Sequence, residues 1–480
     1  MIRKSLYIHL KNFMLSDGII NRIRIDKNLT VAIALAILMV FFLLMFVDIG
    51  DSFFSFVMSL DIDFLIVYGY LYFVKKEKNW FNPYSFCWLS ISLFSFGHVI
   101  LYSLGLEAPK FFLFDSYPLE LVNEYLIFGF LSLIALLFSG VFVINSQIES
   151  CMPKLHLDTD VNAKRIFLIM LLISMPFYLY RIFTLMKMAM MYGYGDVFEM
   201  KGSVVVAIFA MWFVPALFGL IYLYKDSFFR YFFLGLSLIP IVCPLIIGTR
   251  SKPFAIVLCL LFLWNSGIKK LTKLQVFCVS FIGFLFLFLT PSIAEYRTST
   301  NSLSFFDILT DNFTLGLTDV SSKFLGEFGG SANIWMRLRD HLLDIYGYNY
   351  GLSYLSSVLC IFPSILFGGF SFAKYANLST WITEAEKTSY GLGFSMLGES
   401  FYNFGWLGVV GIFFVGLFIF YSISCFWLPQ ILVRYKYVFS SIALYIFSTT
   451  GRDSMYLSVR HIFYCIVIPA LLIYLTREKH

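Results

Sequence analysis

The stretch FGWLGVVGIFFVGLFIFYSISCFW, residues 404–427, carries no acidic or basic side chain. An apolar run of about 18 or more residues is long enough to cross a hydrocarbon core of roughly 30 Å as a helix. In lipid, only helices and closed barrels satisfy their backbone polar groups. Because the run is continuous rather than alternating, it predicts a transmembrane helix.

Similar runs recur along the whole chain of 480 residues, which is 60% hydrophobic, only 13% charged and has a mean hydropathy of +0.82. They predict an all-α polytopic membrane protein with about twelve transmembrane helices. We place these helices near 29–47, 59–74, 84–104, 123–144, 166–186, 204–224, 231–248, 253–268, 274–291, 404–427, 437–450 and 461–476.

This pattern divides the chain into four parts. Residues 1–28 form an amphipathic N-terminus, 29–291 hold the first nine helices, 292–396 form one large outer loop, and 397–480 hold the last three helices. Long loops are usually functional. Within this loop, residues 354–369 are interrupted by Pro363 and predict a re-entrant or surface-lying hairpin.

The basic residues indicate the orientation. Lys and Arg gather in the N-terminus and the inner loops and are few in the short outer loops, which predicts that both termini are cytoplasmic. The net charge of +6 is scattered over short loops and does not indicate a nucleic-acid partner. No CxxC, GxxxxGK[ST], GxGxxG or HExxH motif occurs, so nucleotide-driven transport and zinc peptidase chemistry have no support.

Several basic residues nevertheless lie on the predicted outer side, where topology disfavours them. They are Arg250, Lys252, Arg297, Arg337, Arg339, Arg452 and Arg460. Arginine binds phosphate bidentately and lysine acts as a point charge, so a converging set would form a diphosphate site. The alternative is that each is an ordinary solvated or snorkelling side chain.

Two polar residues precede the apolar run, in the glycine-rich stretch SYGLGFSMLGESFYNFGWLG, residues 389–408. Glu399 and Asn403 share a helical face, four residues apart. A carboxylate at this depth is expected to face a cavity or a cation. Contact with sugar hydroxyls or general-base catalysis is the functional interpretation, and an ion pair with an outer arginine is the alternative.

Two further stretches contain candidate site residues. In GRDSMYLSVRH, residues 451–461, Asp453, Tyr456 and Arg460 form one helical stripe, which fits a sugar-binding strip or a salt bridge. Glu327 opens EFGGSANIW, residues 327–335, which fits a ligand loop or a helix start.

The pair Asp61 and Asp63 in SLDIDF, residues 59–64, could hold a divalent metal through oxygen. Helix capping and topology are the simpler explanation of this pair. We therefore expect no cofactor, with metal binding at Asp61 and Asp63 as the alternative.

An ordered set of motifs resembles one family. The motifs are GTRSKP (248–253), AEYR (294–297), GEFGGSANI (326–334), YGYNYGLSYLSSVLCIFP (346–363), GLGFSMLGESFYNFGWLG (391–408) and GRDSMYLSVRH (451–461). The set resembles the bacterial O-antigen polymerases of the Wzy type, which are also called oligosaccharide repeat unit polymerases. The likeness is best from residue 243 to the end.

The resemblance implies a GT-C-like membrane glycosyltransferase of the bacterial plasma (inner) membrane. Such enzymes join undecaprenyl-diphosphate-linked repeat units on the outer face, and a flippase and a chain-length regulator are the expected partners. Glu399, His341 and Glu327 are the candidate bases, in that order. The rival functions are an O-antigen ligase and a flippase for lipid-linked oligosaccharides.

Overall fold

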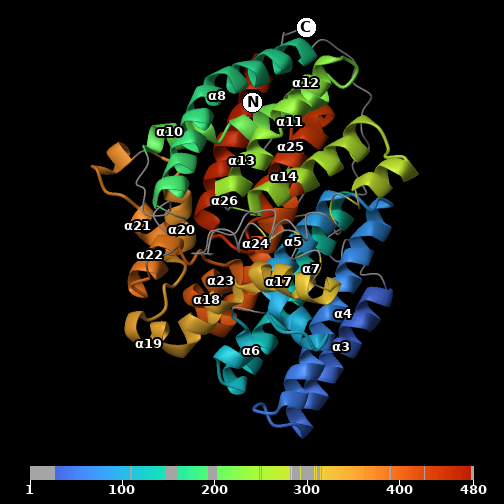
Figure 1. Ribbon diagram of the computed structural model, residues 1–480, viewed down its shortest axis with the longest axis vertical. Coiled ribbons are helices and arrows are strands. Elements are labelled where there is room, and N and C mark those ends of the chain that lie inside the picture. Colours follow the sequence, from blue (N-terminus) through green and yellow to red (C-terminus); the bar gives the residue numbers. More distant parts are fainter. Residues whose placement is uncertain are drawn as a thin grey trace, which may run out of the picture.

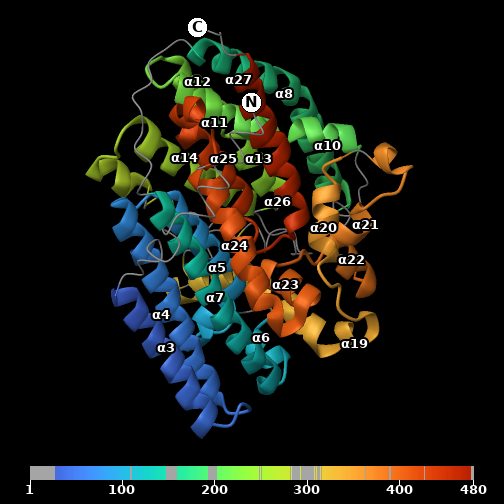
Figure 2. The same cartoon turned by 180° about the vertical axis from the view of Figure 1, so that it is seen from behind.

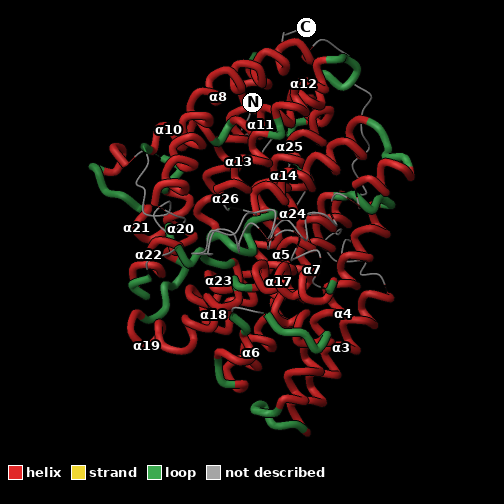
Figure 3. The backbone as a smooth tube through the Cα atoms, viewed as in Figure 1, coloured by secondary structure: helices red, strands yellow, loops and turns green. Residues whose placement is uncertain are grey.

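The structure is a computed structural model, and it describes residues 27–476 apart from several gaps. These gaps are 109–110, 148–158, 193–202, 248, 250, 280, 282, 284–291, 293–307, 309, 311–313, 315, 363, 389–390 and 426. All regular structure in the described residues is helical, and no strand occurs among them (Figure 3). The predicted all-α class is therefore confirmed.

Eight helices in the described ranges are long and apolar enough to cross a membrane. They are Ser52–Glu77, Pro83–Ser103, Leu119–Ser146, Val161–Met188, Val205–Leu223, Ser251–Ile268, Met396–Ser424 and Met455–Leu475. Two shorter apolar helices are Ile33–Phe46 and Phe229–Leu245. A polytopic membrane protein is confirmed, whereas the number twelve and the GT-C-like arrangement stay predictions.

The N-terminal helices lie toward one end of the molecule, and one late helix packs along them nearer the centre (Figures 1 and 2). These helices are α3 (Lys27–Phe46), α4 (Ser52–Glu77), α5 (Pro83–Ser103), α6 (Leu113–Ser116), α7 (Leu119–Gln147) and α24 (Gly408–Ser424). Asp51 caps α4 by accepting the Phe53 N–H at 2.9 Å. Helix α24 lies along α7 because Gly416 leaves room for Ser139.

The other end contains the middle helices and the last ones (Figure 1). They are α8 (Thr159–Tyr192), α10 (Val204–Ala210), α11 (Phe213–Leu223), α12 (Phe229–Leu236), α13 (Ile239–Ile247), α14 (Ser251–Phe262), η1 (Leu263–Ile268), η5 (Gln430–Tyr435), α25 (Lys436–Phe447), α26 (Met455–Ile462), η6 (Phe463–Val467) and α27 (Ile468–Leu475). Helix α25 lies where the sequence predicts a helix at 437–450, and its 12 residues make it shorter than a full span.

The predicted outer loop folds into short helices. They are α17 (Leu317–Gly329), α18 (Ala332–Arg337), η2 (Leu338–Leu342), α19 (Leu343–Tyr346), α20 (Leu352–Leu359), η3 (Ser364–Phe367), α21 (Ala373–Ala376) and α22 (Leu378–Ala385), followed by α23 (Met396–Phe404) and η4 (Gly405–Leu407). Helix α17 crosses α5 where Gly97 meets Gly329, and a Cβ atom on either glycine would collide with the other helix's backbone.

Helix α20 shows inverted polarity. It buries Ser353, Ser356 and Ser357 and exposes Leu355 and Val358. An exposed apolar face of this kind suits a segment that lies against lipid, since water would favour the opposite arrangement. The predicted hairpin of residues 354–369 begins in this helix, and its entry into the membrane stays a prediction.

Candidate functional site

Basic side chains from three segments of the chain converge at one place. Lys252 at the start of α14 lies within electrostatic range of Arg181 on α8 and of Asp453 in the turn before α26. The cluster is completed by Arg452 beside Asp453 and by two residues of α26. We name Arg181, Lys252, Arg452, Arg460 and His461, together with Asp453, the cationic cluster.

Positive charge in the cationic cluster exceeds negative charge. Asp453 is its single acid, and no salt bridge of the described residues involves Arg181, Lys252, Arg452 or Arg460. The Arg460 Nη1 donates to the Tyr456 hydroxyl at 2.7 Å, while the Arg460 Nε is buried without a hydrogen-bond partner. An excess of cations with an unused N–H group is an arrangement that can bind an anion.

Asp453 balances part of this charge. Burial raises the pKa of Asp453 above its usual value, and the nearby charges of Lys252 and Arg452 and a bond from Thr449 oppose that shift. The Asp453 carboxyl group is therefore close enough to both basic residues to feel their charge. An anion that enters the cluster must compete with this carboxylate.

Glu399 lies in the first turn of α23 and is completely buried. Its Oε1 accepts a hydrogen bond from the Ser353 hydroxyl at 2.8 Å, and its Oε2 accepts one from the Met455 N–H at 2.7 Å. Ser353 belongs to the first turn of α20 and Met455 begins α26, so the carboxylate lies at the N-termini of two other helices, where a negative charge is favoured. Glu399 thus joins three helices.

Asn403 extends the same network and is also fully buried. Its Nδ2 donates to the Ser353 hydroxyl at 2.8 Å and to the Glu399 carbonyl at 2.7 Å, and its Oδ1 accepts the Gly351 N–H at 2.9 Å. Neither Glu399 nor Asn403 exposes a polar atom, so sugar contact would require the network to open.

The segment that precedes α23 connects the Glu399 network to the cationic cluster. Gly393 has a φ of +73° and approaches the Arg452 carbonyl so closely that a Cβ atom would lie 3.3 Å from it. The next residue, Phe394, donates its N–H to that same carbonyl at 3.2 Å. The position of the turn at Arg452 and Asp453 therefore depends on α23 and on the segment before it.

A second charged cluster lies in the loop helices. Glu386 binds Arg337 through Oε2 and accepts the His341 Nε2–H at 2.7 Å through Oε1. The His341 Nδ1–H donates to Asp340 at 3.0 Å. Because both ring nitrogens donate to carboxylates, this geometry fits a charged imidazolium rather than a free base.

Arg339 is likewise neutralised. It binds Glu124 of α7 through two nitrogens, at 2.7 and 3.2 Å, which ties η2 to the start of that helix. Arg337 and Arg339 were predicted to bind diphosphate with the other outer cations. In the structure Arg337 pairs with Glu386 and Arg339 with Glu124, and their role in diphosphate binding stays a prediction. Lys252, Arg452 and Arg460 are the predicted residues that lie together.

The remaining predicted residues fall elsewhere. Arg250 and Arg297 lie outside the described residues, and Glu327 lies near the C-terminal end of α17. Asp63 accepts a hydrogen bond from Ser103, whereas Asp61 has no hydrogen-bond partner for its Oδ2. Within the described ranges, no group of three His, Cys, Asp or Glu residues could hold a metal ion.

A model of the family O-antigen polysaccharide polymerase Wzy matches residues 30–479, nearly the whole chain. The chain belongs to this family. No curated protein and no solved structure matches it significantly. As a Wzy polymerase, this multi-pass membrane protein polymerises O-antigen repeat units, and the ligase and flippase functions are not favoured. Its substrate is a lipid-linked oligosaccharide.

Arg181 and His461 belong to this polymerase's cationic cluster but are not among the site residues that the sequence predicts. Arg181 is the single basic residue within the predicted helix at 166–186. A charged side chain inside an apolar span is expensive and usually functional, and that signal identifies Arg181 without a structure. Ser353, which joins Glu399 and Asn403, carries no comparable sequence signal.

The stability of the polymerase is expected to depend on pH through His341. Partial burial disfavours the charged ring, but the bonds and charges of Asp340 and Glu386 outweigh it and raise the pKa of His341 above its ordinary value. This contribution is complete below the unfolded pKa of about 6.5 and is lost as pH rises through the higher folded pKa. We expect the Tm of wild type to fall from pH 6 to pH 9 more steeply than that of His341→Gln. Parallel Tm profiles would contradict this.

Proposed function

We propose that this polymerase transfers a growing glycan from a lipid diphosphate to the terminal sugar hydroxyl of an incoming lipid-linked repeat unit. The bond between the donor's anomeric carbon and the phosphate oxygen breaks, and a bond from that carbon to the acceptor oxygen forms. The acceptor hydroxyl gives its proton to a general base, and the lipid diphosphate leaves with the bonding electron pair.

The cationic cluster is the observation that supports this proposal. Charge develops on the departing diphosphate, and fixed donors aimed at developing charge are usually the largest contribution to catalysis. Arg460 offers an unused buried Nε, and Lys252 and Arg452 have a single acid between them. Among the described charged groups, the cationic cluster is the place where an anionic leaving group would be stabilised best.

The structure gives the three candidate bases different surroundings. Both Glu399 oxygens accept hydrogen bonds from buried donors, which favours a positioning role over proton transfer. His341 is engaged by two carboxylates. Glu327 lies on α17 and is half-buried. A base within reach of the acceptor hydroxyl would contribute by general-base catalysis, and of the three candidates we propose Glu327 for it, since the two carboxylates favour the protonated ring of His341.

We place the reaction at the outer face of the bacterial inner membrane, with both termini in the cytoplasm. The excess of Lys and Arg in the inner segments supports this orientation. A flippase would deliver the repeat units and a chain-length regulator would set the product length. We propose that the polymerase works together with both of these proteins.

Lipid binding tests the cationic cluster directly. The purified full-length chain in nanodiscs would be titrated with undecaprenyl diphosphate and with undecaprenyl monophosphate. We expect the diphosphate to bind more tightly, and Lys252→Ala to weaken its binding about tenfold, because one charge-assisted contact is lost. Lys374→Ala, an exposed lysine on α21, is the control and should bind like wild type. Equal binding by Lys252→Ala and wild type would refute the assignment.

A further inference from the structure

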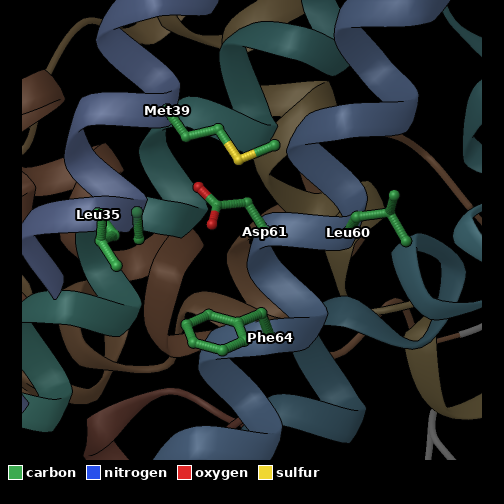
Figure 4. A pocket seen from close by; sticks show the side chains of 6 residues that line it. Leu35, Met39, Leu60, Asp61 and Phe64 are labelled. Carbon is green, nitrogen blue, oxygen red and sulfur yellow. The ribbon is translucent and has the colours of Figure 1, made fainter. Parts of the chain in front are cut away.

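A cavity opens between α3 and α4, and none of its lining residues belongs to the cationic cluster (Figure 4). Its volume is about 280 Å³, and it is lined by Leu35, Ala36, Met39, Leu60, Asp61 and Phe64. Leu35, Met39, Leu60 and Phe64 are exposed, so the cavity opens on the outer surface of the helix bundle. Five of the six lining side chains are apolar.

The sixth lining residue is an acid. Asp61 is 5% exposed, its Oδ2 has no hydrogen-bond partner, and its carboxyl group points into the cavity toward α3 (Figure 4). No salt bridge or charged neighbour of Asp61 occurs in the part of the chain that the structure describes. Asp63, two residues along, differs because its Oδ2 accepts a bond from Ser103, although its Oδ1 is also buried without a hydrogen-bond partner. A buried acid without a partner inside a membrane protein indicates a function.

The chemistry of the lining restricts the occupant. An ordered water needs two to four polar partners, and Asp61 is the only polar side chain here. Leu35 and Met39 lie near the middle of the 20-residue helix α3, so each end of the helix is roughly 10 Å away at about 1.5 Å per residue. A lipid headgroup at the membrane surface does not reach that depth.

A lysine side chain fits both the apolar lining of the cavity and the carboxyl group of Asp61. Its aliphatic stem packs along apolar surface while its ammonium group pairs with a carboxylate. Helix α3 lies at the edge of the molecule in both views, and its outward faces are largely exposed, so a neighbouring membrane helix has access to the cavity (Figures 1 and 2). We propose that the α3–α4 cavity binds the lysine side chain of a partner transmembrane helix, with Asp61 as its counter-ion.

The test uses the full-length chain in nanodiscs and a synthetic transmembrane peptide. The peptide is an alanine–leucine helix with one central lysine, and its binding is measured by energy transfer to a dye on the chain. A peptide with leucine at that position is the reference. We expect the lysine peptide to bind at least about tenfold more tightly, the gain expected of one buried charge pair. Asp61→Asn should abolish that preference and Asp63→Asn should retain it.

A second measurement needs no variant of the chain. Moving the peptide lysine six residues toward one end should reduce its affinity to that of the leucine peptide. Equal binding of all peptides to wild type would overturn the proposal, as would an unchanged preference in Asp61→Asn. A lipid that copurifies with wild type but not with Asp61→Asn, or an Asp61-dependent dimer without peptide, would assign the cavity to that occupant and overturn it too.

Discussion

Glu399→Ala is expected to destabilise the polymerase by about 3 kcal/mol or more and to abolish polymer formation. The substitution removes the acceptor of the Ser353 hydroxyl and of the Met455 N–H, both in a buried place. A buried donor left unsatisfied costs about 1–3 kcal/mol, so two such donors make a large effect for one residue. The starts of α20 and α26 lose their common anchor. Thermal unfolding in micelles and the length of the surface polysaccharide measure both consequences.

The control is Glu384→Ala, which removes an exposed carboxylate from α22. Its Tm and product length should match wild type. Glu399→Gln distinguishes positioning from base catalysis, because the amide keeps one acceptor but presents an NH₂ group to the second donor. A lowered Tm in Glu399→Gln supports positioning. An inactive Glu399→Gln with the Tm of wild type would instead make Glu399 the base and contradict our interpretation.

Arg460→Ala is expected to reduce polymerisation about a hundredfold while the protein stays folded. Arg460 supplies an unused buried Nε and a permanent charge to the cationic cluster. Loss of one donor that stabilises developing charge typically lowers kcat by about 10²–10³-fold. The rate of polymer growth from purified lipid-linked repeat units measures the effect, and the Tm reports whether the fold persists.

Two variants accompany Arg460→Ala. Arg460→Lys keeps the charge without the planar guanidinium, and we expect it to recover only part of the rate. Tyr456→Phe removes the hydroxyl that Arg460 binds but keeps the ring whose centroid lies 5.3 Å from the guanidinium, and its rate should stay close to wild type. A rate for Arg460→Ala equal to that of wild type would exclude Arg460 from the diphosphate site.

The membrane helices can be predicted from the sequence, whereas the partners of single charged side chains cannot. Apolar runs predict helices because, in lipid, a helix lets the backbone N–H and C=O groups of a single segment form hydrogen bonds with one another. The described spans accordingly coincide with predicted ones within several residues, as Pro83–Ser103 does with 84–104. Charge alone treats Arg337, Arg339 and Arg460 as equivalent outer arginines. The structure separates them, because Glu386 and Glu124 neutralise the first two.

The role of Glu399 likewise depends on a partner that is distant in the sequence. Its sequence predicts that Glu399 and Asn403 share a helical face, and the structure places them so. That Ser353 lies between them, 46 residues away from Glu399, follows only from the packing of α20 against α23. The choice between base and anchor depends on such a long-range partner.

The sequence by itself determined that this protein lies in a membrane, that it is helical and which family it resembles. Composition and local periodicity suffice for this because they act over one helix at a time. Only the tertiary structure decided that Lys252 and Arg460 gather around a single acid, and which polar side chains are buried anchors. A side chain's charge is local, but its neutralisation depends on partners brought together by folding.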